Sequence, residues 1–195
     1  MNIRQSLGAV AVLAGMMGLG SERVWPAEST ITVLTNFYSV TGSNLFELRT
    51  AMAQARPWKT NLHFDAFTRW SVRWQFQSVV QDGQFRVDAF ATQTKAVVTL
   101  PRWLPPEGVP PEVVKPWAQF LKGLMTHEEG HVRLAREAAA AIRREVAALG
   151  SYASRQELTD AINNTANRVL DRYRRQERDY DLQTRHGVLQ GARFR

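Results

Sequence analysis

The chain contains no cysteine, and this absence limits its chemistry. Disulfides, thiolate metal ligands and a cysteine nucleophile are all excluded. A zinc site in this chain would therefore use nitrogen and oxygen ligands only, which favours a catalytic site over a structural one.

Lysine is also scarce, since only four of the 25 Lys and Arg residues are lysine. The formal net charge is nevertheless +7, which could favour anionic envelope surfaces or acidic substrates. Basic residues alternate with Glu and Asp throughout the C-terminal half, as on solvated helix faces. We therefore expect no nucleic-acid partner.

The sequence has no apolar run long enough to cross a bilayer, which takes about 20 residues. The apolar run Leu7–Leu19 is shorter, follows Arg4 and precedes small residues. This pattern predicts a signal peptide over residues 1–27, cleaved near Gly20 or Ala27. The protein should then be periplasmic or secreted, without a stable membrane span after cleavage. An uncleaved N-terminal anchor is the alternative.

The remaining residues, 28–195, are enough for one domain with a sizeable core, and no internal repeat is visible. Ser29–Val40 is rich in β-branched and aromatic residues and predicts a strand. Asn44 and Glu47 form a capping box that predicts a short helix over Leu45–Ala55.

A second strand is predicted by alternation of large and polar residues. The large positions are Thr68, Trp70, Val72, Trp74 and Phe76. The Asp82-Gly83 turn should bring Gln84–Ala91 back against this strand. Lys95–Leu100 predicts a further strand that ends at Pro101. Together these segments predict an antiparallel sheet.

The C-terminal half is helical in pattern. Pro116 suits the first turn of a helix that continues to Leu149, because Gly150 is a natural stop. Ser154 and Glu157 form a capping box for a second long helix that runs toward Tyr180. Strands first and helices after predict an α+β fold, with a stiff proline-rich loop between them.

The first long helix carries His127-Glu128-Glu129-Gly130-His131. On a helix the two histidines lie about 40° apart around the axis and about 6 Å apart along it, so both rings can reach one ion. This is the H-E-x-x-H arrangement of zinc peptidases, in which Glu128 would act as general base for a zinc-bound water. Thr126 and Gly130 are small and would let a neighbouring element pack closely.

Other interpretations of the motif are a chance pattern on a helix surface and a metal site without peptidase activity. A catalytic zinc also needs a third protein ligand. Glu137 and Glu145 on the same helix fail on angle and on distance, respectively. The residues that stay open are Glu157, Asp160, Asp181, His186 and His63. The many polar groups of the tail favour Asp181 or His186.

An ordered set of motifs extends this pattern over nearly all of residues 28–195. The set comprises Tyr38-Ser39-Val40-Thr41-Gly42, Glu47-Leu48-Arg49, Thr68-x-Trp70-x-Val72-x-Trp74, Thr99-Leu100-Pro101-x-Trp103, Trp117, His127-Glu128-x-Gly130-His131 and Tyr180-Asp181-x-x-Thr184-x-His186-Gly187-x-x-Gln190-Gly191-Ala192. With these motifs the chain resembles the bacterial domain-of-unknown-function family DUF922, described as predicted secreted zinc-dependent proteases.

The resemblance implies an exported, zincin-like metallopeptidase domain over residues 28–195 that binds Zn²⁺. It implies His127 and His131 as ligands, Glu128 as the catalytic base and His186 as third ligand, with Asp181 as its second-shell partner or alternative. The expected partner is a peptide or protein substrate in the cell envelope, for which Lys95–Leu100 would offer a sheet edge. Alternative functions are a non-catalytic, zinc-stabilised binding or scaffolding protein and a zinc hydrolase of a cell-wall amide.

Overall fold

The computed structural model describes residues 28–58 and 64–194. The predicted signal peptide and His63 therefore lie outside the described residues. The order of the elements is α+β: strands and one short helix come first, and two long helices follow. The elements are β1 (Thr30–Val40), α1 (Leu45–Ala55), β2 (Phe67–Gln81), β3 (Gln84–Trp103), α2 (Pro111–Ala147), α3 (Arg155–Thr184) and the 3-10 helix η1 (Val188–Gln190).

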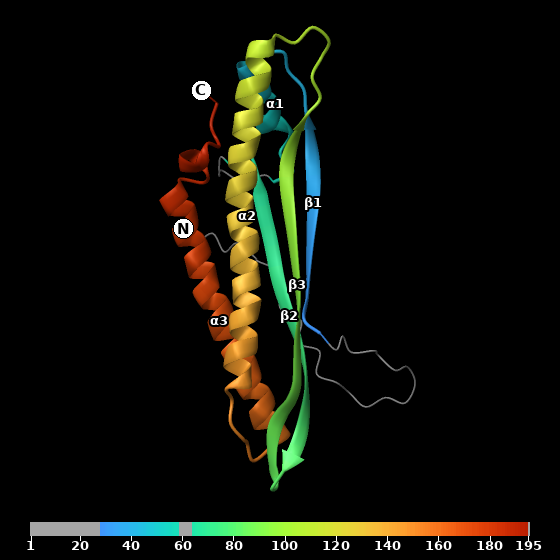
Figure 1. The fold of residues 1–195 in the computed structure, drawn as a ribbon, viewed down its shortest axis with the longest axis vertical. Helices are drawn as coiled ribbons and strands as arrows, with labels where there is room; N and C mark the ends of the chain where they lie inside the picture. Colours follow the sequence, from blue (N-terminus) through green and yellow to red (C-terminus); the bar gives the residue numbers. More distant parts are fainter. Residues whose placement is uncertain (1–27, 59–63, 195) are drawn as a thin grey trace, which may run out of the picture. The chain divides into compact units, whose positions relative to one another are not determined.

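The three strands form one sheet in the order β1-β3-β2 (Figure 1). The hairpin at Asp82-Gly83 makes β2 and β3 antiparallel, as predicted. By contrast, β1 runs parallel to β3: the side chain of Ser29 accepts from Thr92 N, and the carbonyl of Val40 accepts from Leu104 N. The sheet is therefore mixed, which corrects the prediction of an antiparallel sheet.

β3 is also longer than the sequence suggested. The residues expected to form two strands form one, which passes through the buried Pro101 to Trp103. Its place between β1 and β2 leaves most of Lys95–Leu100 without a free edge, which argues against the expected pairing of a substrate along that segment.

The local signals of the helices are confirmed. Asn44 Oδ1 accepts from Glu47 N at the start of α1. Ser154 Oγ accepts from Glu157 N at the start of α3. α2 begins earlier than predicted, at Pro111, where a missing N–H costs nothing. Pro116 therefore lies inside the helix.

Contacts divide the described residues into two compact units. The first contains the residues up to Thr32, Trp70–Lys95 and Ala135–Tyr173, and the second contains Val33–Arg69, Ala96–Leu134 and the chain from Arg174 onward. In the first unit, small residues of α2 such as Ala139 pack with apolar residues of α3 such as Ile162. Trp74 packs against this core and donates through Nε1 to Asn163 Oδ1 at 3.1 Å.

The second unit has a core of its own. Leu48 and Met52 of α1 are fully buried, as is Phe120 of α2. Next to Phe120 lies Phe194, with ring centroids 4.3 Å apart. The chain after α3 is thus packed against α2 within this unit, and the His127 motif belongs to the same unit.

Candidate metal centre

The motif lies in the middle of α2 with its three functional side chains buried. His127, Glu128 and His131 are 4%, 3% and 6% exposed, whereas the intervening Glu129 is exposed. The planes of the two rings are nearly perpendicular, and their Nε2 atoms are 3.2 Å apart. A chance pattern on a helix surface would not bury these side chains, so the motif is part of a built site.

The third group comes from the last turn of α3. Asp181 Oδ1 lies 3.2 Å from His127 Nε2 and 3.1 Å from His131 Nε2. Within the described ranges, His127, His131 and Asp181 form a group that can hold a metal ion. The second helix extends past Tyr180 to Thr184, so Asp181 is helical and not part of the tail.

The geometry of these three atoms fits a metal ion. Ligands of a tetrahedral ion with bonds of about 2.0–2.1 Å lie about 3.3–3.4 Å apart. Although it lies this close to both rings, Asp181 Oδ1 is buried without a hydrogen-bond partner. Three Lewis-basic atoms that converge in this way, one of them a buried carboxylate oxygen without a hydrogen-bond partner, are best explained as ligands of a shared cation.

His186, the expected third ligand, is not in this group. It follows the end of α3 with a positive φ of 50°, its side chain is half exposed, and its Nδ1 is 3.7 Å from Asp181 Oδ1. The geometry therefore supports Asp181 in its place. Glu157 and Asp160 lie in the first turns of α3 and are not part of this group. Glu157 accepts from Ala153 N, and Asp160 accepts from Gln156 Nε2.

Both histidines have a partner at their other ring nitrogen. His131 Nδ1 lies 3.2 Å from Glu177 Oε1, one helical turn before Asp181 on α3. His127 Nδ1 lies 3.0 Å from Gln190 Oε1. Such outer partners orient metal-ligating histidines. Glu177 was missed in the sequence, although its i, i+4 spacing to Asp181 on a predicted helix is a signal that could have found it.

The site is strongly acidic around His131. Burial alone would lower the pKa of His131, but the carboxylates of Asp181, Glu177 and Glu128 outweigh it and raise the pKa to about 10. Burial likewise opposes ionisation of Asp181, yet the neighbouring imidazoles hold its pKa well below its usual range. The carboxylates therefore favour a positive charge between them, either a protonated His131 or a bound metal ion.

Glu128 is held by a residue that the motif does not contain. Thr68, buried near the start of β2, donates its hydroxyl to Glu128 Oε2 at 2.6 Å. Burial raises the pKa of Glu128, and the Thr68 hydroxyl and the two histidines oppose that rise. Glu128 is thus a buried carboxyl next to the group of His127, His131 and Asp181 without being a member of it.

Gly130 permits the close approach of α3 to the motif. A Cβ atom at this position would lie 2.1 Å from the hydroxyl oxygen of Tyr180. With Gly130 in place, the ring of Tyr180 stacks on His127, with centroids 5.0 Å apart and an interplanar angle of 8°. The expectation that Gly130 lets a neighbouring element pack closely is confirmed.

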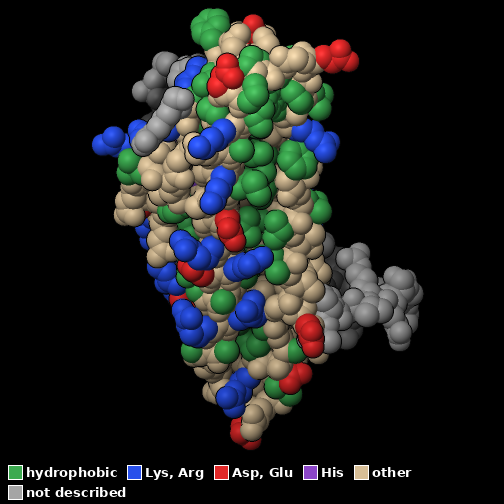
Figure 2. Space-filling model, turned by 45° about the horizontal axis from the view of Figure 1, so that its top comes forward, with side chains coloured by type: hydrophobic (Ala, Val, Ile, Leu, Met, Phe, Trp, Pro, Cys, Tyr) green, Lys and Arg blue, Asp and Glu red, His purple; other side chains and the backbone are tan. Residues whose placement is uncertain are grey.

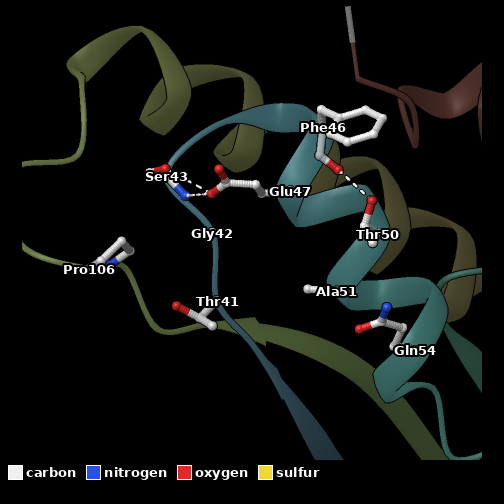
Figure 3. A pocket seen from close by; sticks show the side chains of 9 residues that line it. All are labelled: Thr41, Gly42, Ser43, Phe46, Glu47, Thr50, Ala51, Gln54 and Pro106. Atoms are coloured by element: carbon white, nitrogen blue, oxygen red, sulfur yellow. Dashed lines mark hydrogen bonds between the residues drawn. The ribbon is translucent and has the colours of Figure 1, made fainter.

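The second unit also has a surface hollow of about 440 Å³ at the start of α1. Figure 3 shows the residues that line it, with hydrogen bonds from Ser43 to Glu47 and from Thr50 to Phe46. Glu47 accepts from the N–H and the hydroxyl of Ser43, which lower the pKa of this exposed carboxyl, and Thr50 donates to the carbonyl of Phe46. No residue of the metal centre lines this hollow.

On the face shown in Figure 2, the many Lys and Arg side chains are separated by apolar and acidic ones. No helix among the described residues is long and apolar enough to span a bilayer.

A family model, described as bacterial protein of unknown function (DUF922), matches residues 35–187. The chain belongs to this family. The matched segment contains β2, the α2 motif, Glu177 and Asp181, and it ends before Gln190. No curated protein matches the chain, and no solved structure matches it either. The family description assigns no activity, so function has to be argued from the site.

Proposed function

We propose that this DUF922 member is an exported zinc metallopeptidase with a zincin-like site, acting on peptide or protein substrates in the cell envelope. In this proposal His127, His131 and Asp181 bind zinc and Glu128 is the general base. The observation that carries it is the convergence of two imidazole Nε2 atoms and one carboxylate oxygen within 3.2 Å of one another, beside a buried glutamate.

Zinc is favoured by the donor set. Two histidines and one carboxylate, with no thiolate, are typical of catalytic zinc sites in peptidases and leave a coordination position for water or substrate. Iron(II) also uses two histidines and one carboxylate. Metal analysis of the purified protein therefore has to measure both elements.

The chain's own residues provide the proton transfers of peptide hydrolysis. A zinc ion bound here would polarise the scissile carbonyl and make water a better nucleophile at neutral pH. Glu128 would take a proton from the attacking water and pass it to the leaving amine. Thr68 holds one carboxylate oxygen of Glu128 at 2.6 Å, so the other oxygen keeps a fixed direction.

Export is part of the proposal because of the N-terminal sequence. Arg4, the apolar run Leu7–Leu19 and the small residues after it have the order of a signal peptide. A periplasmic or secreted location also suits a chain that contains no thiol open to oxidation. Expression with and without residues 1–27, followed by fractionation, tests this part.

The decisive test compares Glu128→Gln with Glu129→Gln in the mature protein. Glu129 is the exposed neighbour, so its substitution controls for the loss of one negative charge on α2. With a mixture of unstructured peptides as substrate, we expect Glu128→Gln to keep its zinc and to cleave about 10²-fold more slowly or worse. Glu129→Gln should cleave like the parent.

The alternatives predict other results. If both variants and the parent hold zinc and none cleaves peptides or cell-wall amides, the zinc-stabilised binding or scaffolding function takes the lead. If cell-wall amides are cleaved and peptides are not, the site is a hydrolase of another substrate class. A fully active Glu128→Gln protein would exclude Glu128 as the base.

A further inference from the structure

The chain after α3, residues 187–194, is held tightly against α2 beside His127. Gly187 has a φ of 83°, and a Cβ atom there would lie 3.0 Å from the Cβ of His127. Farther along, a Cβ atom on Gly123 would lie 2.3 Å from Ala192 N. These close approaches fix the path of the segment and bring Gln190 next to the His127 ring.

Tyr180 decides which end of the Gln190 amide faces His127. The Tyr180 hydroxyl donates to the backbone carbonyl of His127 at 3.1 Å. Because a hydroxyl has one proton, it must accept in its 3.0 Å contact with Gln190 Nε2. The amide nitrogen of Gln190 thus donates to the Tyr180 hydroxyl, and the amide oxygen lies 3.0 Å from His127 Nδ1.

Thr184 gives an independent indication of the same proton position. Its hydroxyl donates to the carbonyl of Tyr180 at 2.8 Å, so its proton is used as well. In its 3.3 Å contact with His127 Nδ1, Thr184 can therefore only accept. Both neighbours of Nδ1 are acceptors, which requires the proton of His127 to lie on Nδ1.

We propose that Gln190 is a positioning residue that, with Tyr180 and Thr184, keeps the proton of His127 on Nδ1 and the Nε2 lone pair free for the metal. This inference rests on the proposed metal site. A histidine without such neighbours exchanges its proton between both ring nitrogens, and one of the two forms presents an N–H to the ion. Gln190 removes that form.

The choice of an amide also suits the charge of the site. Glu177 already places a carboxylate behind His131, and Asp181 and Glu128 are close to both rings. A neutral acceptor behind His127 orients the ring without adding another buried negative charge. The metal affinity of this domain should consequently depend on its C-terminal segment as well as on its ligands.

The test measures zinc affinity by competition with a chromophoric chelator in Gln190→Leu, Gln190→Glu and Gln183→Leu. Gln183 is exposed in the last turn of α3 and supplies the matched control. We expect Gln190→Leu to bind zinc about 10- to 100-fold more weakly. Gln190→Glu keeps an acceptor for Nδ1 and should stay within a few fold of the parent, as should Gln183→Leu.

A second measurement reports on the proton itself. In ¹H–¹⁵N spectra of the zinc-loaded protein with labelled histidine, the Nδ1–H of His127 should be protected from exchange in the parent and lost in Gln190→Leu. If Gln190→Leu does not fold, Tyr180→Phe takes its place, because it keeps the stacked ring and removes the hydroxyl that orients the amide.

Zinc affinity and Nδ1–H protection unchanged in Gln190→Leu and in Tyr180→Phe would overturn the inference while leaving the metal site intact. A parent protein that binds no zinc would instead overturn the proposed function, so the two failures are distinguishable.

Discussion

Replacing Gly130 by Ala adds a single methyl group at the point where Tyr180 of α3 packs against α2, beside the metal centre. The new Cβ atom would lie 2.1 Å from the hydroxyl oxygen of Tyr180 and 2.3 Å from its Cζ, whereas ordinary contacts begin at 3.4 Å. The Tyr180 ring must therefore move by about 1 Å or more, or the two helices must separate.

The expected cost follows from what Tyr180 would lose. Overpacking costs about 1–3 kcal/mol. The hydrogen bonds of the hydroxyl with His127 O and Gln190 Nε2 contribute about 0.5–1.5 kcal/mol each. Against this, Ala is favoured over Gly inside a helix by about 1 kcal/mol. We expect a net loss of about 2–3 kcal/mol in the free energy of unfolding, and Tm lower by roughly 4–12 °C.

The assay is equilibrium unfolding in urea together with zinc competition, and Gly150→Ala is the control. A Cβ atom on Gly150 meets nothing within 4 Å, so that variant should be as stable as the parent or slightly more stable. Gly130→Ala should in addition bind zinc at least tenfold more weakly, because His127 loses its stacked partner. A Gly130→Ala protein as stable as the parent, with full zinc affinity, would refute the packing described for Tyr180.

Three further predictions concern other parts of the site. Thr68→Val should lower the free energy of unfolding by about 1.5–3 kcal/mol at neutral pH, because Glu128 loses the hydroxyl that donates to it at 2.6 Å. Urea unfolding measures this, with the exposed Thr35→Val as control, and equal stability of the two variants would contradict it. Removal of metal with a chelator should lower Tm, and restored zinc should raise it again; a Tm that ignores both treatments would speak against a metal that stabilises the folded state. Gly123→Ala should detach residues 187–194, because its Cβ atom would lie 2.3 Å from the backbone of Gly191; unchanged hydrogen exchange in that segment would contradict this.

Local signals in the sequence predicted much of the fold. The capping box at Asn44 gave α1 with its observed bounds, and the one at Ser154 gave the start of α3. Such caps are local interactions within four residues, so they can be identified without knowledge of the tertiary structure. The α2 motif was found for the same reason, since one helical turn brings its two histidines together.

The strand pairing could not be predicted in the same way. Pro101 was expected to end a strand, because proline lacks the N–H that a paired strand uses. In a hairpin that turns at Asp82-Gly83, Phe67 at the start of β2 lies opposite about residue 98 of β3. Beyond that point β3 has only β1 as a neighbour. Pro101 therefore lies where no residue of β2 would need a hydrogen bond from its missing N–H.

The third ligand depends on tertiary structure, and therefore the sequence left it open. Asp181 and His186 lie five residues apart, and the end of α3 at Thr184 decides which of them is helical. The helix carries Asp181 to the two histidines and leaves His186 half exposed. Gln190 and Thr68 reach the site from distant parts of the chain, and no spacing rule connects them to the motif.

The most direct test of the metal centre is the zinc content per chain of the mature protein and of Asp181→Asn, Asp179→Asn and His186→Ala. Asp179 is an exposed carboxylate on the same helix and serves as control. We predict about one zinc in the parent, in Asp179→Asn and in His186→Ala, and little in Asp181→Asn. A parent without zinc after zinc has been supplied, or a protein that loses its zinc with His186 and keeps it without Asp181, would contradict the site described above.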